Sequence, residues 1–250
     1  MKTEWDYTKL ADAYLKRPDY AESVIDRMIE TAGMEQGGTV CDIGAGAAHL
    51  TIKLAERGLK VCAVEPNDAM RSNGIRRTTQ FADVSWFEGV GEHTGMDDSA
   101  FDLVTFGSSF NVCDRQMALK ETARILKSSG WFACMWNHRD LEDPLQQEIE
   151  SILKRHIENY SYGTRREDQT GVIEESGLFG NVIYLEGSVI HEISSEDFIE
   201  GWKSHGTVYR QSLEKFSLIN DDIKKLVESL DTKMLKVPYT TRVWMAQYCG

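Results

Sequence analysis

The sequence of 250 residues predicts an α/β fold: a doubly wound, mostly parallel sheet of seven strands with a helical cap. Through residue 136, short apolar runs alternate with stretches whose apolar residues recur at helical spacing. After residue 140, longer amphipathic stretches surround two strand-like segments. Strands that alternate with helices are typical of β-α-β crossovers, which cover both faces of a parallel sheet.

The first part of the chain carries five expected strands. Pro18 and Asp19, followed by Glu22, are typical of a capping box and predict a helix that ends near Ala32, before Gly37 and Gly38. The strands expected after it are Thr39–Ile43, Leu59–Val64, Val84–Phe87, Phe101–Phe106 and Trp131–Trp136. The helices expected between them are Ala47–Arg57, Asp68–Thr79 and Asp114–Lys127.

We expect residues 1–140 to form a Rossmann-like core, and residues 141–250 to form the cap and the last two strands, which extend the sheet edge. The helices expected here are Leu145–Ile157, Gln169–Ser176, Ser194–Ser204 and Ile219–Leu230. The strands expected here are Val182–Ile193 and Pro238–Gln247. Residues 141–180 and 194–235 are expected to build the cap over the site.

The charge balance restricts the class of partner. Lys and Arg number 28 against 40 Asp and Glu, a net charge of −12. Nucleic acids and anionic membranes bind positively charged protein surfaces, and the net charge of this chain is negative. We therefore expect neither nucleic acid nor membrane as a partner, but a small molecule. Charge and composition do not predict whether the chain is a monomer or a dimer.

Cysteine usage and apolar runs predict a cytoplasmic location. The five cysteines form no C-x-x-C pair, and an odd number indicates neither a disulfide framework nor a zinc site, so we expect no metal. The first residues are polar and acidic, unlike a signal peptide. No apolar stretch approaches the roughly 18 residues that a membrane span requires.

The most informative segment is Val40–Leu50, in which an expected strand leads through Asp42-x-Gly44-x-Gly46 directly into a helix. Glycines at such a bend let a ligand approach the backbone, and the helix N-terminus presents unpaired N–H groups. Glu65 ends the next strand, where an acid can accept hydrogen bonds from both ribose hydroxyls. This spacing predicts a site for a nucleoside cofactor.

The same residues favour S-adenosylmethionine over a dinucleotide. The third glycine of a dinucleotide fingerprint is replaced by His49, and Asp42 would repel a pyrophosphate. A carboxylate at Asp42 can instead pair, directly or through water, with a cationic amino-acid end. S-adenosylmethionine carries an α-ammonium and a sulfonium and has no phosphate.

Five segments, in order and correctly spaced, resemble the class I S-adenosylmethionine-dependent methyltransferases, in their broad small-molecule branch. Asp42–Gly46 resembles the first motif, and Ala63–Met70 the second-strand motif whose acid binds ribose. Glu88–Gly95 is similar to the loop that cradles adenine, and Phe101–Phe106 to the fourth strand. Leu126–Trp131 resembles the turn into the fifth strand, with serines in place of a proline and a glycine. The resemblance covers roughly residues 5–140 well and the remainder loosely.

The resemblance implies where the nucleoside half of the cofactor binds. Glu65 is implied to hold the ribose, and Gly91 and Glu92 to flank the adenine. Met70 or Pro66 is implied to pack on the adenine ring.

The resemblance also implies the site of the methionine half. Asp42, Gly44 and Gly46 are implied to line it, and Tyr14 and Arg17 are candidates for its carboxylate. Two further contacts are expected from the same segments, Ala45 and Ser108. Many relatives carry an aromatic His-Trp pair where this chain has Ser108–Cys113, so the resemblance does not extend to the acceptor pocket.

The implied reaction transfers a methyl group to an oxygen or nitrogen of a small molecule by in-line displacement. A base is needed only if the acceptor must first lose a proton. Candidate bases are His138, just after the fifth expected strand, and His205 in the cap. The carboxyl end of a strand is where a doubly wound sheet places ligands, which favours His138. Arg165 and Arg166 are candidates for recognition of an anionic acceptor; the alternative is that they lie in a solvated loop and bind no ligand.

Other functions remain open. A carboxyl O-methyltransferase acting on a free or carrier-bound acid would be indicated by an arginine-lined pocket. An NAD-dependent oxidoreductase would use the same crevice, but His49 and the lack of a Tyr-x-x-x-Lys pair disfavour it. A non-catalytic nucleoside-binding protein would bind S-adenosylhomocysteine and methylate nothing.

Overall fold

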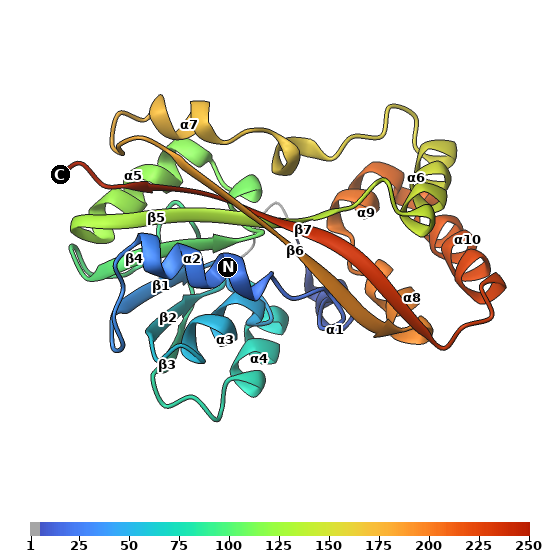
Figure 1. Ribbon diagram of the computed structural model, residues 1–250, viewed down its shortest axis with the longest axis horizontal. Helices are drawn as coiled ribbons and strands as arrows, with labels where there is room; N and C mark the ends of the chain where they lie inside the picture. The colour runs from blue at the N-terminus through green and yellow to red at the C-terminus, as the bar shows by residue number, and fades with distance from the viewer. Residues whose placement is uncertain (1–5) are drawn as a thin grey trace.

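Seven strands form one mixed sheet in the order β3-β2-β1-β4-β5-β7-β6, in a computed structural model that describes residues 6–250 (Figure 1). The polar N-terminal residues 1–5 lie outside the described residues. The first five strands are parallel, and β7 is antiparallel to its neighbours β5 and β6. The strands are β1 (Thr39–Ile43), β2 (Lys60–Val64), β3 (Val84–Phe87), β4 (Phe101–Gly107), β5 (Leu126–Arg139), β6 (Ile183–Ser194) and β7 (Met234–Gln247). The predicted doubly wound, Rossmann-like sheet is confirmed.

Helices cover both faces of this sheet because its central strands are apolar on both sides. On one face, α2 (Glu22–Thr31) and α3 (His49–Ala55) bury their apolar residues against the strands. On the other face, α5 (Arg115–Ile125) and α7 (Thr170–Glu174) lie side by side. The helix α4 (Asp68–Arg77) packs against β3. Next to α4 lie the two short N-terminal helices, η1 (Thr8–Leu10) and α1 (Ala11–Tyr14).

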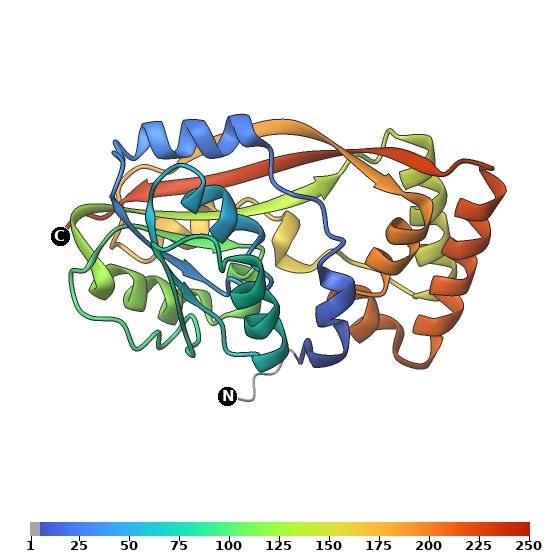
Figure 2. The ribbon, with the colours of Figure 1, turned by 90° about the horizontal axis from the view of Figure 1, so that it is seen from below.

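The long hairpin of β6 and β7 joins the sheet to the helical cap. Its far end continues beyond the parallel strands and runs among the cap helices (Figures 1 and 2). There Ile193, Leu235 and Val237 pack in one apolar cluster with the helices. The cap helices are α6 (Pro144–His156), α8 (Ser195–Trp202), α9 (Gly206–Ser212) and α10 (Phe216–Ser229). Short 3-10 helices occur at η2 (Phe110–Val112), η3 (Gly163–Arg166) and η4 (Leu213–Lys215).

Two strands begin earlier than predicted. The strand β7 begins at Met234, so Pro238 lies inside it, where the missing N–H would normally break the ladder. The carbonyl of Pro238 accepts from the Asp140 N–H at 3.3 Å, so this edge of Pro238 faces the end of β5 at Arg139, where regular pairing stops. The strand β5 begins at Leu126, through the turn that was expected to precede it.

Helix boundaries differ where tertiary contacts override local signals. The helix α2 begins at Glu22 and not at Asp19, because the Asp19 side chain bonds to His49 and does not cap the helix. The helix α9 was not predicted, since its sequence of Gly, Thr and Val residues has weak helical propensity. Residues 169–180, expected in the cap, pack on the core through Ile173 and Phe179.

None of the described helices is long and apolar enough to cross a lipid bilayer.

Candidate functional site

The chain bends sharply between β1 and α3, and glycines make this bend possible. Gly44 and Gly46 both adopt left-handed conformations, with φ of +67° and +56°. A Cβ atom at Gly44 would lie 2.4 Å from the Cβ of Ser109, so no larger residue fits without displacing it. The Gly44 and Ala45 N–H groups donate to the Val64 carbonyl at 2.8 and 3.1 Å. The bend is thereby fixed to the end of β2.

Glu65 follows β2 and lies against the glycine bend. Its Oε2 accepts a hydrogen bond from the Gly46 N–H at 2.9 Å, and its Oε1 accepts one from the Asn67 N–H at 2.8 Å. Burial raises the pKa of Glu65 to about 7. Each carboxylate oxygen keeps a second acceptor position, so Glu65 can accept two more hydrogen bonds, such as those from vicinal hydroxyls.

Asp42 ends β1 and lies beneath the bend. Its Oδ1 accepts from the Thr105 hydroxyl at 2.9 Å, and its Oδ2 accepts from the Thr51 hydroxyl at 2.7 Å. Burial raises the pKa of Asp42 to about 6. Because the residue is fully buried and both oxygens are bonded, Asp42 acts on the space above it through its charge.

A cleft extends from the bend between the loop after β2 and the loop after β3. It encloses about 740 Å³, part of it open to solvent. Its lining residues are Tyr7, Tyr14, Ile43, Gly44, Gly46, Glu65, Pro66, Asn67, Met70, Val90, Gly91, Glu92, Ser108, Ser109, Val112 and Cys113. No Lys or Arg occurs among these described residues, and the walls are largely apolar. This donor set fits a nucleoside without phosphates better than a dinucleotide.

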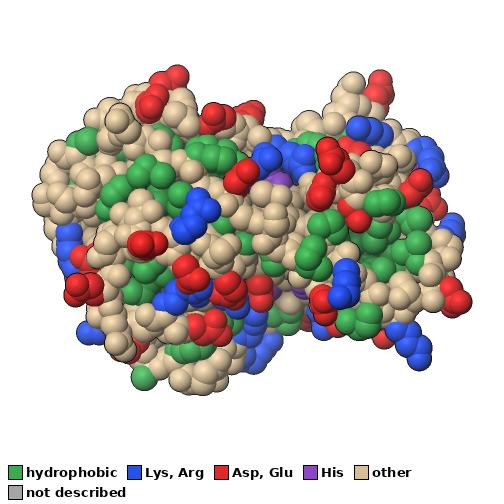
Figure 3. Space-filling view, viewed as in Figure 1, with side chains coloured by type: hydrophobic (Ala, Val, Ile, Leu, Met, Phe, Trp, Pro, Cys, Tyr) green, Lys and Arg blue, Asp and Glu red, His purple; other side chains and the backbone are tan. Residues whose placement is uncertain are grey.

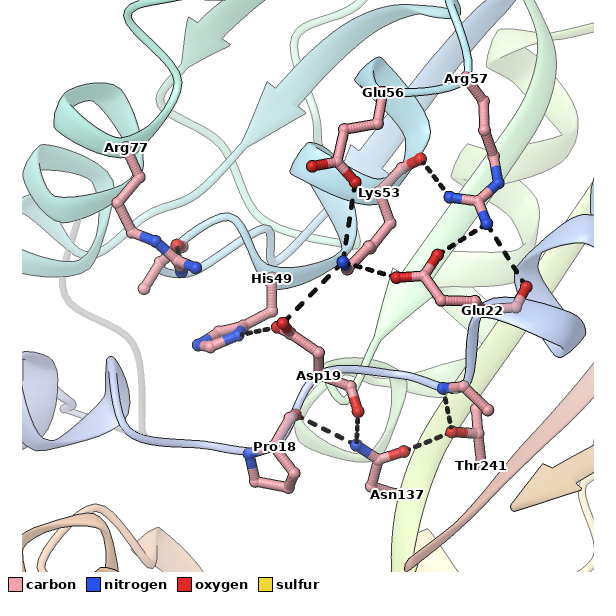
Figure 4. A network of polar contacts seen from close by, with 12 residues as sticks. Pro18, Asp19, Glu22, His49, Lys53, Glu56, Arg57, Arg77, Asn137 and Thr241 are labelled. Carbon is pink, nitrogen blue, oxygen red and sulfur yellow. Dashed lines mark hydrogen bonds and ion pairs between the residues drawn. The ribbon is translucent and has the colours of Figure 1, made fainter. Parts of the chain in front are cut away.

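The segment between α1 and α2 crosses the bend and is anchored by polar contacts (Figure 4). His49 Nδ1 lies 2.9 Å from Asp19 Oδ1, and His49 Nε2 lies 3.2 Å from the Tyr14 carbonyl oxygen. From β5, the Asn137 amide donates to the carbonyls of Pro18 and Asp19 at 3.1 and 2.9 Å. These contacts hold Tyr14 at the junction of the cleft with a second cavity.

The second cavity continues from the cleft toward the cap and encloses about 1090 Å³, part of it open to solvent. Tyr14, Gly44, Gly46 and Ser108 line both spaces. The second cavity is further lined by residues from the end of β5, from η3 and from the loop before α9. Prominent among them are Arg17, Trp136, Asn137, His138, Arg139, Tyr162, Arg165, Arg166 and His205.

Arg17 connects the N-terminal segment to the cap. Its Nε donates to the Ser204 hydroxyl at 2.7 Å, and its Nη2 donates to the Ser204 carbonyl at 3.1 Å. The guanidinium carbon lies 5.4 Å from the centre of the Tyr14 ring. Arg17 therefore borders the second cavity without a carboxylate partner among residues 6–250.

Sequence comparison places this geometry among known proteins. A family model described as a methyltransferase domain matches residues 41–134. An uncharacterized methyltransferase of Mycobacterium tuberculosis is 32% identical over 139 residues, which are 56% of this chain and 54% of the relative. A demethylmenaquinone methyltransferase of Staphylococcus epidermidis is 31% identical over 112 residues, 43% of this chain and 46% of the relative. The chain thus spans about half the length of these curated relatives.

Solved structures share the whole fold at low sequence identity. The YcgJ protein of Bacillus subtilis has a TM-score of 0.56 at 16% identity, over 91% of this chain and 98% of that one. Phosphoethanolamine N-methyltransferase 2 of Haemonchus contortus, in complex with S-adenosyl-L-methionine, has a TM-score of 0.57 at 15% identity, over 96% of this chain and 57% of that one. Residues 41–134 therefore match a methyltransferase domain, in agreement with the resemblance seen in the sequence.

Every residue expected to contact the cofactor lines one of the two connected spaces. The cleft is lined by Glu65, Pro66, Met70, Gly91 and Glu92. The second cavity is lined by Arg17, Asp42 and Ala45, and Tyr14, Gly44, Gly46 and Ser108 lie where the two meet. Asp42 differs from its expected role in one respect, since threonine hydroxyls occupy its carboxylate.

His138 lies in the second cavity as a neutral ring. Its Nε2 donates to the Arg165 carbonyl at 3.1 Å, and its buried Nδ1 has no hydrogen-bond partner among residues 6–250. Burial, together with the charges of Arg166 and Arg242, lowers the pKa of His138 to about 3. Its Nδ1 can accept a hydrogen bond from an acceptor molecule, but it retains a proton only weakly.

His205 is less available than His138. Its ring stacks on Trp202 with centroids 4.1 Å apart, and its Nε2 lies 3.2 Å from Nη1 of Arg17. Burial and the charge of Arg17 hold the pKa of His205 well below its usual value. Because Arg17 can only donate, the lone pair on Nε2 is already engaged.

Some residues that line the cleft and the second cavity were not identified from the sequence. Asn137 and Arg139 flank His138, so the rule that ligands bind at strand carboxyl ends could have found them. Tyr7 and Tyr162 come from segments without a recognisable pattern, and only the fold brings them to the cavity.

Proposed function

We propose that this chain transfers the methyl group of S-adenosylmethionine to an oxygen or nitrogen of a small molecule. The proposal rests on one observation, that the cleft and the second cavity lie next to each other and share lining residues. One is a cleft with a carboxylate, apolar walls and no cation among its described lining residues, and the other is a separate cavity under the cap. A nucleoside fits the first, which leaves the second for an acceptor.

The residues of the cleft fit the proposed cofactor. Glu65 would accept hydrogen bonds from the ribose hydroxyls, and Met70 and Gly91 would enclose the adenine. Arg17 and Tyr14, on the segment above the bend, would face the carboxylate of the methionine half. S-adenosylmethionine, when bound, supplies a methyl group activated by a sulfonium sulfur. The chain itself then provides proximity, orientation and exclusion of water.

The cap favours a small acceptor. The second cavity is formed by the core on one side and by η3 and the cap loops on the other, so a macromolecule would have to thread between them. A net charge of −12 also repels nucleic acids and anionic membranes at long range. We therefore propose a small-molecule acceptor and no nucleic acid or membrane partner.

Calorimetry and a labelled-methyl assay test this function. The purified chain should bind S-adenosylhomocysteine and not NAD, and it should move labelled methyl from S-adenosylmethionine into a small product of a metabolite extract. Glu65→Gln should weaken the binding, whereas Glu30→Gln, on an exposed position of α2, should not. Preferential binding of NAD would favour the oxidoreductase, and binding of S-adenosylhomocysteine without any methylation would favour a non-catalytic protein.

A further inference from the structure

The second cavity concentrates positive charge in a chain whose net charge is −12. Four arginines line it, namely Arg17, Arg139, Arg165 and Arg166. On the face shown in Figure 3, Lys and Arg side chains gather beside a histidine at the waist between the core and the cap. Such a group of buried or partly buried cations is stable only if anionic groups of the chain or of a ligand lie close to it.

Within residues 6–250, only one of the four arginines has a carboxylate partner. Arg139 Nη2 lies 2.7 Å from Oε2 of Glu150, which also accepts a hydrogen bond from the Tyr162 hydroxyl. Arg166 donates to the Arg139 carbonyl at 2.8 Å, and its guanidinium lies 4.1 Å from the centre of the Tyr162 ring. A carbonyl and an aromatic ring orient Arg166 without neutralising it.

Arg165 is the least compensated of the four. Its guanidinium makes no hydrogen bond or ion pair with any of residues 6–250, and it lies 5.9 Å from the centre of the Tyr162 ring. Burial and the neighbouring charges of Arg17 and Arg139 lower the pKa of Arg165. The backbone at Arg165 is nonetheless fixed, because its carbonyl accepts the His138 hydrogen bond. A positioned cation without a partner is suited to binding an anion.

The cofactor carries one carboxylate, and the N-terminal segment provides Arg17 for it. Arg165 and Arg166 lie instead on η3, which is attached to the end of β5 through His138 and Arg139. Two uncompensated cations therefore remain on the cap side of the cavity.

The histidines that line the cavity among residues 6–250 are poor candidates for a base. Three histidines line it. His138 holds a proton only weakly, His205 is engaged by Arg17, and both ring nitrogens of His49 are engaged by Asp19 and the Tyr14 carbonyl. An alcohol or an ammonium group would have to lose a proton to the protein before or during transfer. A carboxylate is already ionised at neutral pH and loses none.

We propose that the methyl acceptor is a small carboxylic acid, held by Arg165 and Arg166 and methylated on a carboxylate oxygen. This inference rests on the proposed function. A carboxylate oxygen forms the new bond to the methyl carbon, while the carbon–sulfur bond breaks and its electron pair stays on sulfur. The products are a neutral methyl ester and a neutral thioether. No proton moves, and the positive and negative charges of the reactants cancel in a partly buried site.

Binding to the S-adenosylhomocysteine complex tests the recognition step. The probes are benzoate, phenylacetate and hexanoate, each paired with its primary amide, with phenyl phosphate as a second anion. We expect the acids to bind at least about tenfold more tightly than the amides, the scale of a charge-assisted hydrogen bond. If S-adenosylhomocysteine does not bind, the proposed function fails, and the same comparison on the free protein still decides the acid preference.

Arg165→Gln should abolish the preference for acids and leave the affinity for S-adenosylhomocysteine unchanged. Its melting temperature should be no lower than that of the unaltered chain, because no hydrogen bond is lost and repulsion among cations is relieved. Arg166→Gln should also weaken acid binding, with some loss of stability. Arg155→Gln, exposed on α6, is the matched control and should change nothing. An acid preference that survives in Arg165→Gln would overturn the assignment.

The nature of the product tests the chemical step. With labelled S-adenosylmethionine, a methyl ester releases volatile labelled methanol in alkali, whereas methyl ethers and methylamines do not. We expect label of this kind from acids in the panel or in a metabolite extract. Alkali-stable label alone, equal binding of acids and amides, or tighter binding of phenyl phosphate than of every acid would each contradict a carboxylate acceptor.

Discussion

Cofactor affinity is expected to depend on pH through Glu65. Burial raises the pKa of Glu65 in the free protein to about 7, from an ordinary value of 4.5. Ribose hydroxyls donate to the ionised carboxylate, so binding favours the form without the proton. Above pH 7 the Glu65 carboxyl is mostly ionised before binding, whereas below pH 7 it must lose a proton for the cofactor to bind. Affinity should therefore fall as the pH falls.

The size of the effect follows from the ionised fraction. If only ionised Glu65 binds, the apparent dissociation constant is multiplied by 1 + 10^(pKa − pH), which is about 1 at pH 8 and about 11 at pH 6. The difference corresponds to about 1.4 kcal/mol. Asp42, whose pKa is raised by burial to about 6, would add a further factor of about 2 at pH 6.

Titration calorimetry with S-adenosylhomocysteine between pH 6 and pH 8 measures this dependence. Glu65→Gln should bind roughly 1.5–3 kcal/mol more weakly at pH 8, as expected for lost charge-assisted hydrogen bonds. The variant should retain only the small pH dependence that Asp42 contributes. Equal affinity at pH 6 and pH 8 in the unaltered chain, or tighter binding at pH 6, would refute the reasoning.

Three further predictions concern other parts of the molecule. Gly44→Ala should lower the free energy of unfolding by more than about 2 kcal/mol, because it combines a left-handed φ with a clash against Ser109. The control Gly33→Ala, which has a positive φ but open space around it, should lower this free energy by only about 1 kcal/mol. Equal losses for the two variants in denaturant titrations would be inconsistent with the clash. His138→Gln should reduce kcat more than it reduces cofactor affinity. The shape of the pH–rate profile between pH 6 and pH 8 should be the same in the variant, because burial keeps the pKa of His138 near 3. An inflection that disappears in the variant would show that His138 titrates between pH 6 and pH 8. A thiol reagent should label exposed Cys249 first in the native protein, as peptide mapping would show. The cysteines expected to resist it lie in strands, and burial raises the pKa of each: Cys41, Cys62 and Cys134. Early labelling of all three would contradict their packing.

Local sequence determined the core because each of its elements carries its own signal. Short apolar runs placed the central parallel strands β1, β4 and β5, since a strand that is buried on both faces must be largely apolar. The Asp42–Gly46 segment predicted the sharp bend beside the cleft, because only glycine tolerates the close approach found at Gly44. Boundaries were less accurate wherever a distant contact replaced a local one, as when Asp19 bonded to His49 and did not cap α2.

Only the tertiary structure decided the charge and the burial of the residues that line the second cavity. Arg17 and Arg165 are far apart in the sequence, and the residues around each do not indicate whether its guanidinium forms an ion pair with an acid in the folded chain. Whether a guanidinium is solvated, paired or uncompensated depends on which segments meet around it, and here β5, η3 and the cap loops meet at one cavity. The same meeting of segments lowers the pKa of His138 to about 3 and leaves its Nδ1 without a hydrogen-bond partner among residues 6–250. Charge and burial at such a site are properties of the assembled chain, because electrostatic interactions depend on distance in space and not on separation along the sequence.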